Sequence, residues 1–370
     1  MRKLFNLFLA VLFFTSCSKS SVTITWNDGK VVTTQVKGDR TFLVEIDKGA
    51  NVTLECNLPP GECPVIRLRG KSKGSFTYKA EHTSTIILDG LNLSAKAGKT
   101  PLNIKNRRTT TLHLLRGTVN KLHDGAQPDD STSAKDCMRC KGDLVITGDG
   151  ELQLKATHTG SKGMKCYADF EMRSGRLKIT TTGNYLREIT VRKPPRNIGQ
   201  RPPVPVVTMA NGDSVAPPPP PPTLSSPMFE QKYRGTCKGA KIMGTALIAG
   251  GELKVSTSSP GAEGFEAKSG ITITGGKIHI EAYDDGLNSN GPILITGGEI
   301  YALSTHNDGL DTNYGKEGCY TQTGGRVELI SLAGPPEESL DTDWTPITHV
   351  GGDLIVKPDL QKEPFFNFQP

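Results

Sequence analysis

Residues 262–311 read AEGFEAKSGITITGGKIHIEAYDDGLNSNGPILITGGEIYALSTHNDGLD, and two signatures recur in and around this stretch. The first is an acid, a small residue, an apolar residue and then an acid or asparagine, at Glu263–Glu266, Asp285–Asn288, Asp308–Asp311 and Glu338–Asp341. Its copies are 22, 23 and 30 residues apart. The second is a glycine pair, at 250–251, 275–276, 297–298, 324–325 and 351–352. Self-similarity at this period predicts a solenoid, because each repeat buries its apolar side only by stacking on its neighbours.

The composition of the repeats indicates which kind of solenoid. Each repeat has two or three short strands rich in Val, Ile, Thr and Tyr, separated by Gly, Asn and Asp, and none has a long run of helix formers. This pattern predicts an all-β parallel β-helix with rungs of about 22–30 residues. Phe265, Leu287, Leu310 and Leu340 are expected to stack as one apolar ladder, with the flanking acids pointing outward.

Residues 1–17, MRKLFNLFLAVLFFTSC, have the plan of a secretory signal: a basic start, a short apolar run and a small-residue ending. The ending resembles a bacterial lipobox, so we expect cleavage before Cys17 and lipidation of its thiol. An ordinary signal peptide with a buried or paired Cys17 is the alternative. Ser18 lacks the aspartate associated with inner-membrane retention, which by analogy implies an outer-membrane lipoprotein of a Gram-negative bacterium, on its surface or periplasmic face.

The remaining chain is expected to form one β-helix domain over residues 18–360, followed by a tail at 361–370. Residues 21–36, SVTITWNDGKVVTTQV, are expected to cover the exposed edge of the first rung. Irregular copies of the first signature lie at Asp124–Gln127 and Lys162–Lys165. The proline-rich residues 190–236 are predicted to be an insertion between two rungs, either a docking tract or flap or simply a tolerated loop.

The charge of the chain is mild. Its formal net charge of +6 becomes about +4 without Arg2 and Lys3, and no block of like charge stands out along the sequence. This balance argues against a nucleic-acid partner. We expect a monomer, because a solenoid needs no second copy to complete its core.

Seven cysteines follow Cys17, and disulfides are the default in an exported protein. Cys56 and Cys63 bracket a turn whose ends should meet, so they are the expected disulfide. Cys140 and Cys166 are expected to stack one rung apart, with Cys237 at a similar place. Cys137 and Cys140 look like half of a zinc site without the other half, which favours a structural role. The pairing stays open for Cys137, Cys140, Cys166, Cys237 and Cys319.

The acids of the repeated signature would stack about 4.8 Å apart on successive rungs, where like charges repel and raise one another's pKa values. A divalent cation with oxygen ligands would relieve this repulsion, and calcium suits an exported site of flexible geometry. The alternative is that these acids only make good turns and are solvated. The expected ligands form one cluster of Asp284, Asp285, Asn288, Asp308 and Asp311, a second of Asp308 and Asp311 with Asp341 and Asp343, and an extension through Glu263 and Glu266.

At these residues the chain resembles the bacterial carbohydrate-binding-domain family of exported β-helices, which is related in fold to pectate lyases. The resemblance covers most of residues 80–355 and is most specific at 262–266, 284–288, 307–311 and 337–341. It implies a right-handed parallel β-helix, bound calcium and attachment to a plant-type polysaccharide, either acidic pectic chains or cellulose. The chain departs from the family pattern at 162–165, where lysines replace the acids, and in its proline-rich insertion.

Three functions remain open. A non-catalytic binder would hold polysaccharide through calcium and through aromatic side chains, for which Tyr283, Tyr314 and Trp344 are candidates, whereas Tyr301 fits rung packing as well. A calcium-dependent polysaccharide lyase would need a basic residue to abstract a proton, and Lys162, Lys165, Lys268 and Arg326 are available without a distinguishing motif. A structural adhesin or envelope scaffold would keep the acids without the sugar. The binder is the prediction.

Overall fold

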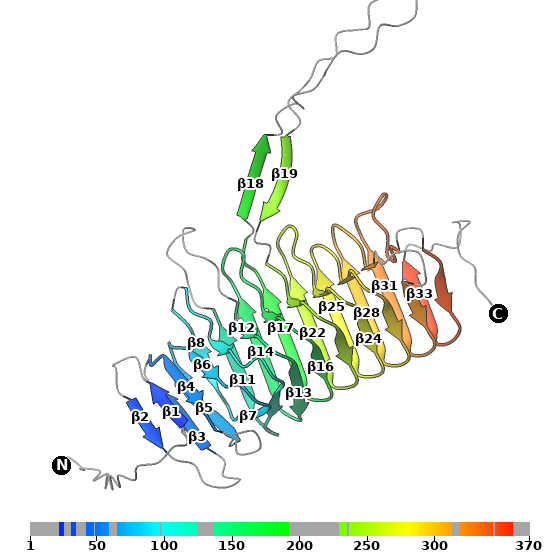
Figure 1. Cartoon of the computed structure of the whole chain (residues 1–370). Coiled ribbons are helices and arrows are strands. Elements are labelled where there is room, and N and C mark those ends of the chain that lie inside the picture. Colours follow the sequence, from blue (N-terminus) through cyan, green and yellow to red (C-terminus); the bar gives the residue numbers. More distant parts are fainter. Residues whose placement is uncertain are drawn as a thin grey trace, which may run out of the picture.

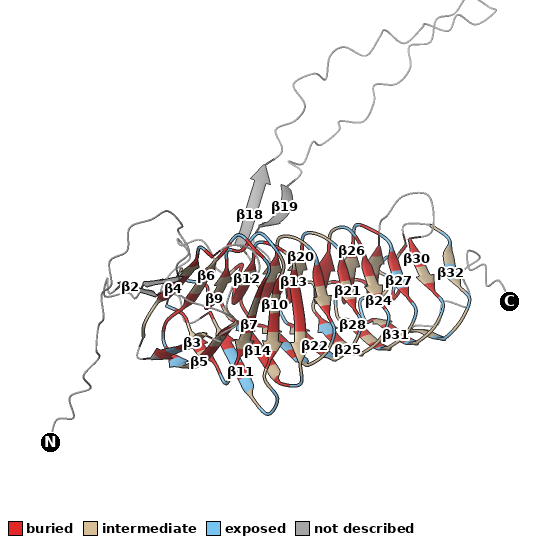
Figure 2. Cartoon of the chain, turned by 60° about the horizontal axis from the view of Figure 1, so that its bottom comes forward, coloured by how far each residue is buried: buried red, intermediate tan, exposed pale blue. Residues whose placement is uncertain are grey.

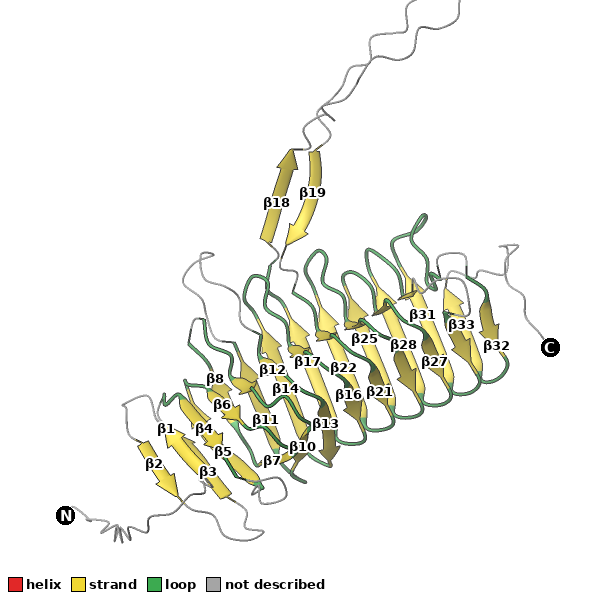
Figure 3. Ribbon diagram, viewed as in Figure 1, coloured by secondary structure: helices red, strands yellow, loops and turns green. Residues whose placement is uncertain are grey.

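The computed structural model describes residues 22–25, 31–34, 42–47, 49–58, 65–96, 98–124, 136–184, 186–191, 229–234, 237–312, 319–342 and 345–357. This part of the chain contains strands and no helix (Figure 3), so it holds no helix long and apolar enough to cross a membrane. The strands stack as a parallel β-solenoid of about nine turns with about 26 residues per turn, which is the elongated body in Figure 1. The predicted all-β parallel solenoid is confirmed.

A regular turn has three strands, and each strand pairs with the equivalent strand of the next turn. β23 (Phe265–Ala267), β24 (Ile271–Ile273) and β25 (Lys277–Ala282) make one turn, and β26 (Leu287–Ser289), β27 (Ile293–Ile295) and β28 (Glu299–Ser304) make the next. The solenoid therefore has three faces, which we name A, B and C in the order of these strands.

The remaining strands of face A are β4 (Val52–Cys56), β6 (Phe76–Lys79), β9 (Leu102–Ile104), β12 (Met138–Cys140), β15 (Met164–Cys166), β20 (Ala240–Ile242) and β29 (Leu310–Thr312). Those of face B are β7 (Ser84–Leu88), β10 (Thr110–Leu114), β13 (Leu144–Gly148), β16 (Phe170–Met172), β21 (Ala246–Ile248), β30 (Tyr320–Gln322) and β32 (Ile347–His349). Those of face C are β8 (Asn92–Ser94), β11 (Val119–His123), β14 (Glu151–Ala156), β17 (Arg176–Thr181), β22 (Glu252–Thr257), β31 (Arg326–Ser331) and β33 (Asp353–Lys357). At the first turns, β3 (Phe42–Asp47) pairs with β5 (Ile66–Ser72), which pairs with both β7 and β8.

The core is a stack of inward-facing apolar side chains, because residues alternate between the inside and the outside of each strand. Figure 2 shows this alternation of buried and partly exposed positions along the strands. Phe265, Leu287 and Leu310 pair in register, and Leu340 precedes the bridge that joins Asp311 to Asp341. All four apolar side chains are buried, so the predicted ladder is confirmed.

The glycine pairs lie at the turn between faces B and C. The second glycine takes a positive φ, for example 89° at Gly276, which other residues rarely adopt. A Cβ on the first would collide with the preceding rung, since at Gly275 it would lie 2.6 Å from the carbonyl oxygen of Ala249. The recurrent Gly-Gly signature is therefore required by the close approach of successive turns.

Two antiparallel strand pairs are added to the parallel stack, one at its first edge and one between two turns. β1 (Val22–Thr25) pairs with β2 (Val31–Thr34) and also with β4, so this segment covers the first edge of face A as predicted. β18 (Leu186–Val191) and β19 (Phe229–Arg234) form an antiparallel pair that stands off the solenoid between β17 and β20 (Figure 1). The insertion therefore begins and ends as paired strands, and its proline-rich residues 192–228 lie outside the described residues.

The cysteines are largely core residues. Cys140 and Cys166 pair in register as predicted, but Ile242 follows them, so the expectation for Cys237 is wrong. Cys137, Cys140, Cys166, Cys237 and Cys319 are buried thiols without disulfides, and burial raises the pKa of Cys237 to about 11. Cys56 is buried, while its expected partner Cys63 lies outside the described residues, so that pairing stays a prediction.

One predicted copy of the signature is misplaced. The register between β11 and β14 puts Asp124 opposite the inward-facing Ala156. The buried Asp124 carboxylate accepts bonds from the amides of Thr157 and His158 at 2.9–3.0 Å. The copy in register with the others is Asp136–Arg139, because Met138 pairs with Met164.

Candidate functional site

Two rows of side chains run along face A, and the repeated signature supplies both. The central row is made by the middle residue of each short strand, which points outward: Arg139, Lys165, Lys241, Glu266, Asn288, Asp311 and Asp341. The turn row is made by the residue two positions before each strand. Backbone hydrogen bonds of 2.8–3.1 Å link the successive turns from Lys162 to Glu338. The members of the turn row are Asp136, Lys162, Lys238, Glu263, Asp285, Asp308 and Glu338.

From Lys162 onward, charge along both rows is segregated by sign. Lys162, Lys165, Lys238 and Lys241 occupy two successive turns, and acids or Asn288 occupy all the described turns that follow. The copy at Lys162–Lys165 was predicted from the sequence, whereas the copy at Lys238–Lys241 was not. That copy lies one regular step before Glu263, and it was hidden because lysines replace both acids.

Face C shows the opposite arrangement and serves as an internal comparison. The first outward residues of its strands, in register, alternate in sign over seven turns: Glu151, Arg176, Glu252, Lys277, Glu299, Arg326 and Asp353. Several of these neighbours form ion pairs, such as Lys277 with Glu299 at 3.2 Å. Cross-strand pairing favours opposite charges as neighbours. The stability of the sheet therefore does not explain why charges of the same sign are neighbours on face A.

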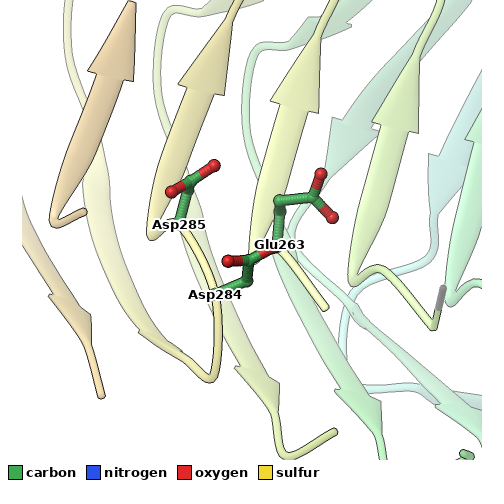
Figure 4. A group of neighbouring side chains, drawn as sticks. All are labelled: Glu263, Asp284 and Asp285. Atoms are coloured by element: carbon green, nitrogen blue, oxygen red, sulfur yellow. The ribbon is translucent and has the colours of Figure 1, made fainter. Parts of the chain in front are cut away.

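Three carboxylates converge where the acidic part of face A begins. Glu263 lies in the turn before β23, and Asp284 and Asp285 lie in the turn before β26; Figure 4 shows them on neighbouring turns. One carboxylate oxygen from each lies within 4.8 Å of the others. Oxygen ligands of one calcium ion, at 2.3–2.6 Å from the metal, are at most about 5 Å apart. The structure therefore brings together three of the predicted metal ligands at a spacing that fits one such ion. We name Glu263, Asp284 and Asp285 the acid cluster.

Burial and neighbouring carboxylates make Asp284 and Asp285 hard to ionise. Burial, followed by the charges of Asp285 and Glu263, raises the pKa of Asp284 to about 7. Burial raises the pKa of Asp285 to about 6, although its carboxylate also accepts hydrogen bonds. The Oε2 atom of Glu263 is buried without a hydrogen-bond partner. The cluster thus holds more negative charge than the described side chains around it neutralise.

Asn288, Asp308 and Asp311 extend the cluster through hydrogen bonds. The Asn288 amide donates to Asp285 Oδ2 at 2.7 Å and to Asp311 Oδ2 at 2.9 Å. Asp308 donates its backbone N–H to Asp285 Oδ1 at 3.3 Å, and its Oδ1 accepts from the backbone N–H of Glu338 at 2.6 Å. Burial raises the pKa of Asp308 to about 8. Asp341 pairs with Asp311 along the backbone, and Asp343 lies outside the described residues.

Glu266 differs from the other predicted ligands because lysines surround it. Its side chain is 1% exposed. Its carboxylate contacts the ammonium groups of Lys238 at 2.7 Å and Lys241 at 3.1 Å, and it also pairs with Lys268. Despite burial, these cations lower the pKa of Glu266 to about 2. Lys238 also pairs with Glu263, so it stands between the basic and the acidic parts of face A.

One predicted aromatic contact residue lies next to the acid cluster. Tyr283 immediately precedes Asp284, and its ring stacks on that of His306 with centroids 3.8 Å apart and planes at 4°. Tyr301 stacks on His279 on face C, with centroids 4.7 Å apart. Tyr314 and Trp344 lie outside the described residues. Tyr283 is partly exposed and His306 is exposed, so this stacked pair lies at the surface, next in sequence to Asp284.

Comparisons with known proteins bear on the fold and the family. A family model described as carbohydrate-binding domain-containing protein matches residues 64–188 and 158–309. No curated protein matches the chain. A polysaccharide lyase-like protein from C. thermocellum, solved as a gadolinium derivative, is similar at 15% identity with a TM-score of 0.44, over 86% of this chain and 100% of that one. A likeness at this score supports no assignment of function.

Proposed function

The chain belongs to the family of carbohydrate-binding domain-containing proteins, and from that premise we propose that it binds an acidic, pectin-type polysaccharide through calcium held on face A. The observation that carries the proposal is the acid cluster, in which three carboxylates lie within 4.8 Å of one another. Binding without cleavage is the proposed activity.

The residues of the cluster fit calcium. Hard divalent cations take oxygen ligands, and carboxylates are their commonest protein partners. Glu263 has a buried oxygen without a hydrogen-bond partner, and burial together with the neighbouring carboxylates raises the pKa values of Asp284 and Asp285 to about 7 and about 6. Glu263, Asp284 and Asp285 would hold the ion. Asn288 and Asn307 would position Asp285, since both amides donate to its carboxylate, at 2.7 Å and 2.5 Å.

Calcium, when bound, supplies positive charge that a uronate carboxylate can share. The residues around it have separate tasks. Tyr283 and His306 present a stacked aromatic surface on which the apolar face of a pyranose ring can pack. The solenoid itself is a rigid, linear support whose turns repeat about every 4.8 Å, so neighbouring sugars of an extended chain can meet equivalent positions along face A.

The lyase alternative is less well supported by the placement of its candidate bases. Arg326 lies on face C, where it pairs with Glu328 at 3.5 Å. Lys268 pairs with Glu266. Lys162 lies three turns before Asp285, and Lys165 lies two turns before Glu266. None of the four combines a free ammonium or guanidinium group with a position beside the acid cluster. We therefore propose a binder that leaves the polymer intact.

We further propose that lipidation of Cys17 anchors the protein in the outer membrane, where an exposed face A would meet polysaccharide outside the cell or in the periplasm. Metabolic labelling with a fatty acid, comparing the chain with its Cys17→Ser variant, tests this proposal. Loss of label in the variant is expected, whereas equal labelling would contradict it.

Native gel electrophoresis tests the binding proposal. The purified chain would run through gels cast with polygalacturonate, in parallel lanes with calcium and with a chelator, and the gels would then be stained for polymer. We expect stronger retardation with calcium and no cleared zone. A cleared zone would establish a lyase, and equal migration with calcium and chelator would reject the calcium-dependent part of the proposal.

A matched pair of variants assigns any calcium effect to the acid cluster. Asp284→Asn removes one carboxylate of the cluster, and Glu299→Gln removes one from the alternating row of face C, with the same change in net charge. We expect calcium-dependent retardation to be lost in the first variant and kept in the second. If both keep it, calcium acts elsewhere.

A further inference from the structure

A basic region lies on the first half of face A, on turns that precede the acid cluster. Lys79, Lys105 and Lys141 follow one another on successive turns, because the backbone N–H of Lys105 donates to Tyr78 at 2.7 Å and that of Lys141 donates to Ile104 at 3.0 Å. Tyr167 takes the next place, its N–H donating to Cys140 at 2.9 Å. The three lysines thus occupy equivalent positions on successive turns, whose backbones are about 4.8 Å apart.

Most of this charge is uncompensated. Glu55 pairs with Lys79 at 3.2 Å, and Asp136 pairs with Arg139 at 2.6 Å. By contrast, no carboxylate of the described residues lies within 4.0 Å of the charged groups of four cations. These four, which we name the basic cluster, are Lys105, Arg107, Lys141 and Lys165.

A tyrosine holds two of these cations together without neutralising them. The ammonium group of Lys141 lies 3.6 Å from the centroid of the Tyr167 ring, and that of Lys165 lies 4.6 Å from it. The guanidinium of Arg139 is 5.9 Å away. Attraction to the ring face offsets part of the repulsion between the cations, and their full charge remains available to a ligand.

The basic cluster also borders a hollow. A cavity of about 460 Å³ is lined by Lys79, Lys105, Arg107 and Lys141, with Glu55 and Glu81 as the two carboxylates. This volume lies in the range of small-ligand sites. Because Lys141 belongs both to the hollow and to the group around Tyr167, the two form one continuous basic surface along the turns.

We propose that the basic cluster is a second, calcium-independent binding site, which pairs directly with carboxylate groups of the same acidic polysaccharide. Arg107 can hold a carboxylate through two parallel hydrogen bonds, and the lysines act as point charges beside it. The turns repeat at about 4.8 Å, which is close to the length of one extended sugar residue, so successive uronates can meet successive cations. This inference takes from the proposed function only that the partner is an acidic polysaccharide.

Titration calorimetry with polygalacturonate in chelator-containing buffer tests this site apart from the calcium site. The double variant Lys141→Gln/Lys165→Gln would be compared with Lys254→Gln/Lys277→Gln on face C, which removes the same two charges. We expect the first variant to weaken calcium-free binding about tenfold and the second to leave it within about twofold, since charged hydrogen bonds carry most of such an interaction. Lys141→Arg/Lys165→Arg should restore binding if the charges matter and the fold is intact.

The outcomes separate the two sites. Calcium-free binding that is equal in all these variants, absent from the parent chain, or equally strong for methyl-esterified polymer would overturn the proposal. So would a stronger association with anionic phospholipid vesicles than with polygalacturonate. If the lysine variant loses calcium-free binding while calcium has no effect on any chain, the basic site stands and the calcium proposal fails. If calcium-dependent binding persists and the lysines have no effect, the reverse holds.

Discussion

Replacing Asp284 by asparagine removes one charge from the acid cluster while keeping the size of the side chain. The pKa of this carboxyl is raised from 3.8 to about 7, mainly by burial and then by the charges of Asp285 and Glu263. A raised pKa means that the folded protein binds the proton more tightly than the unfolded chain does. The resulting stability is fully present below about pH 4 and is lost as the pH rises through about 7.

The size of the effect follows from the shift. Three pKa units correspond to about 4 kcal/mol of unfolding free energy at pH 8, at about 1.4 kcal/mol per unit. Asp285 shares part of this repulsion and titrates with Asp284, and an asparagine amide still has to be solvated or hydrogen-bonded. We therefore expect the variant to be about 2 kcal/mol more stable than the parent chain at pH 8 without metal. This difference should shrink as the pH falls and vanish below about pH 4, where Asp284 is protonated in both the folded and the unfolded chain.

Thermal unfolding followed by circular dichroism measures this difference. In chelator at pH 8, Asp284→Asn should melt a few degrees above the parent chain, and this difference in Tm should shrink as the pH falls and vanish below about pH 4. Calcium should raise the Tm of the parent at pH 8, because a ligand that binds only the folded state stabilises it, and should raise that of the variant much less. A lower Tm of the variant in chelator at pH 8, or an equal response of both chains to calcium, would refute the reasoning. Glu299→Gln, on face C, should change neither comparison.

Three further substitutions probe the surroundings of the cluster. Glu266→Gln should destabilise the fold by about 3 kcal/mol, because it leaves three partly buried lysines without their shared counter-charge. Denaturant unfolding would measure this loss, and an unchanged unfolding midpoint would contradict the ion-pair geometry. Lys238→Met should raise calcium affinity about tenfold in titration calorimetry, since removing a unit charge near Glu263 is worth about 1.4 kcal/mol or more at this depth; weaker binding would mean that Lys238 supports the site. Leu287→Ala should cost about 3 kcal/mol by opening a cavity in the apolar ladder, and a loss below about 1 kcal/mol would show that the rungs close around it.

The fold was predictable from the sequence because equivalent positions of successive rungs in a solenoid carry the same kinds of residue. The Gly-Gly pairs mark the same turn of five successive rungs, and the apolar residue of the acidic signature marks the inner position of face A. The alternating charges of face C are equally visible, since the residues that follow five successive glycine pairs are Glu252, Lys277, Glu299, Arg326 and Asp353. This alternating row was not part of the prediction, although its charges indicate the register of face C independently of the glycine pairs.

The site was only partly predictable, because its contacts depend on how turns of unequal length are aligned. The copy at Asp124 fitted the signature by residue type, yet a long connection after β11 places Asp136 and Arg139 in the row instead. The enclosure of Glu266 by three lysines requires Lys238 and Lys241 to be its neighbours, and the proline-rich insertion separates these lysines from the preceding turn in sequence. Spacing alone cannot show which charges meet across such insertions.

The contrast between the faces connects both proposed sites to one ligand. In the first outward row of face C each charge lies beside the opposite charge, so neighbouring charges offset one another. On face A, from Lys162 onward, the sign changes once along the central row, between Lys241 and Glu266, so most charges on either side of this point have a charge of the same sign one turn away, at a backbone spacing of about 4.8 Å. The acidic half needs cations and the basic half needs anions. An acidic polysaccharide carries anionic carboxylates along one extended chain, and its calcium counter-ions are cations. Such a chain can therefore offer opposite charges to the basic and the acidic parts of face A at the same time.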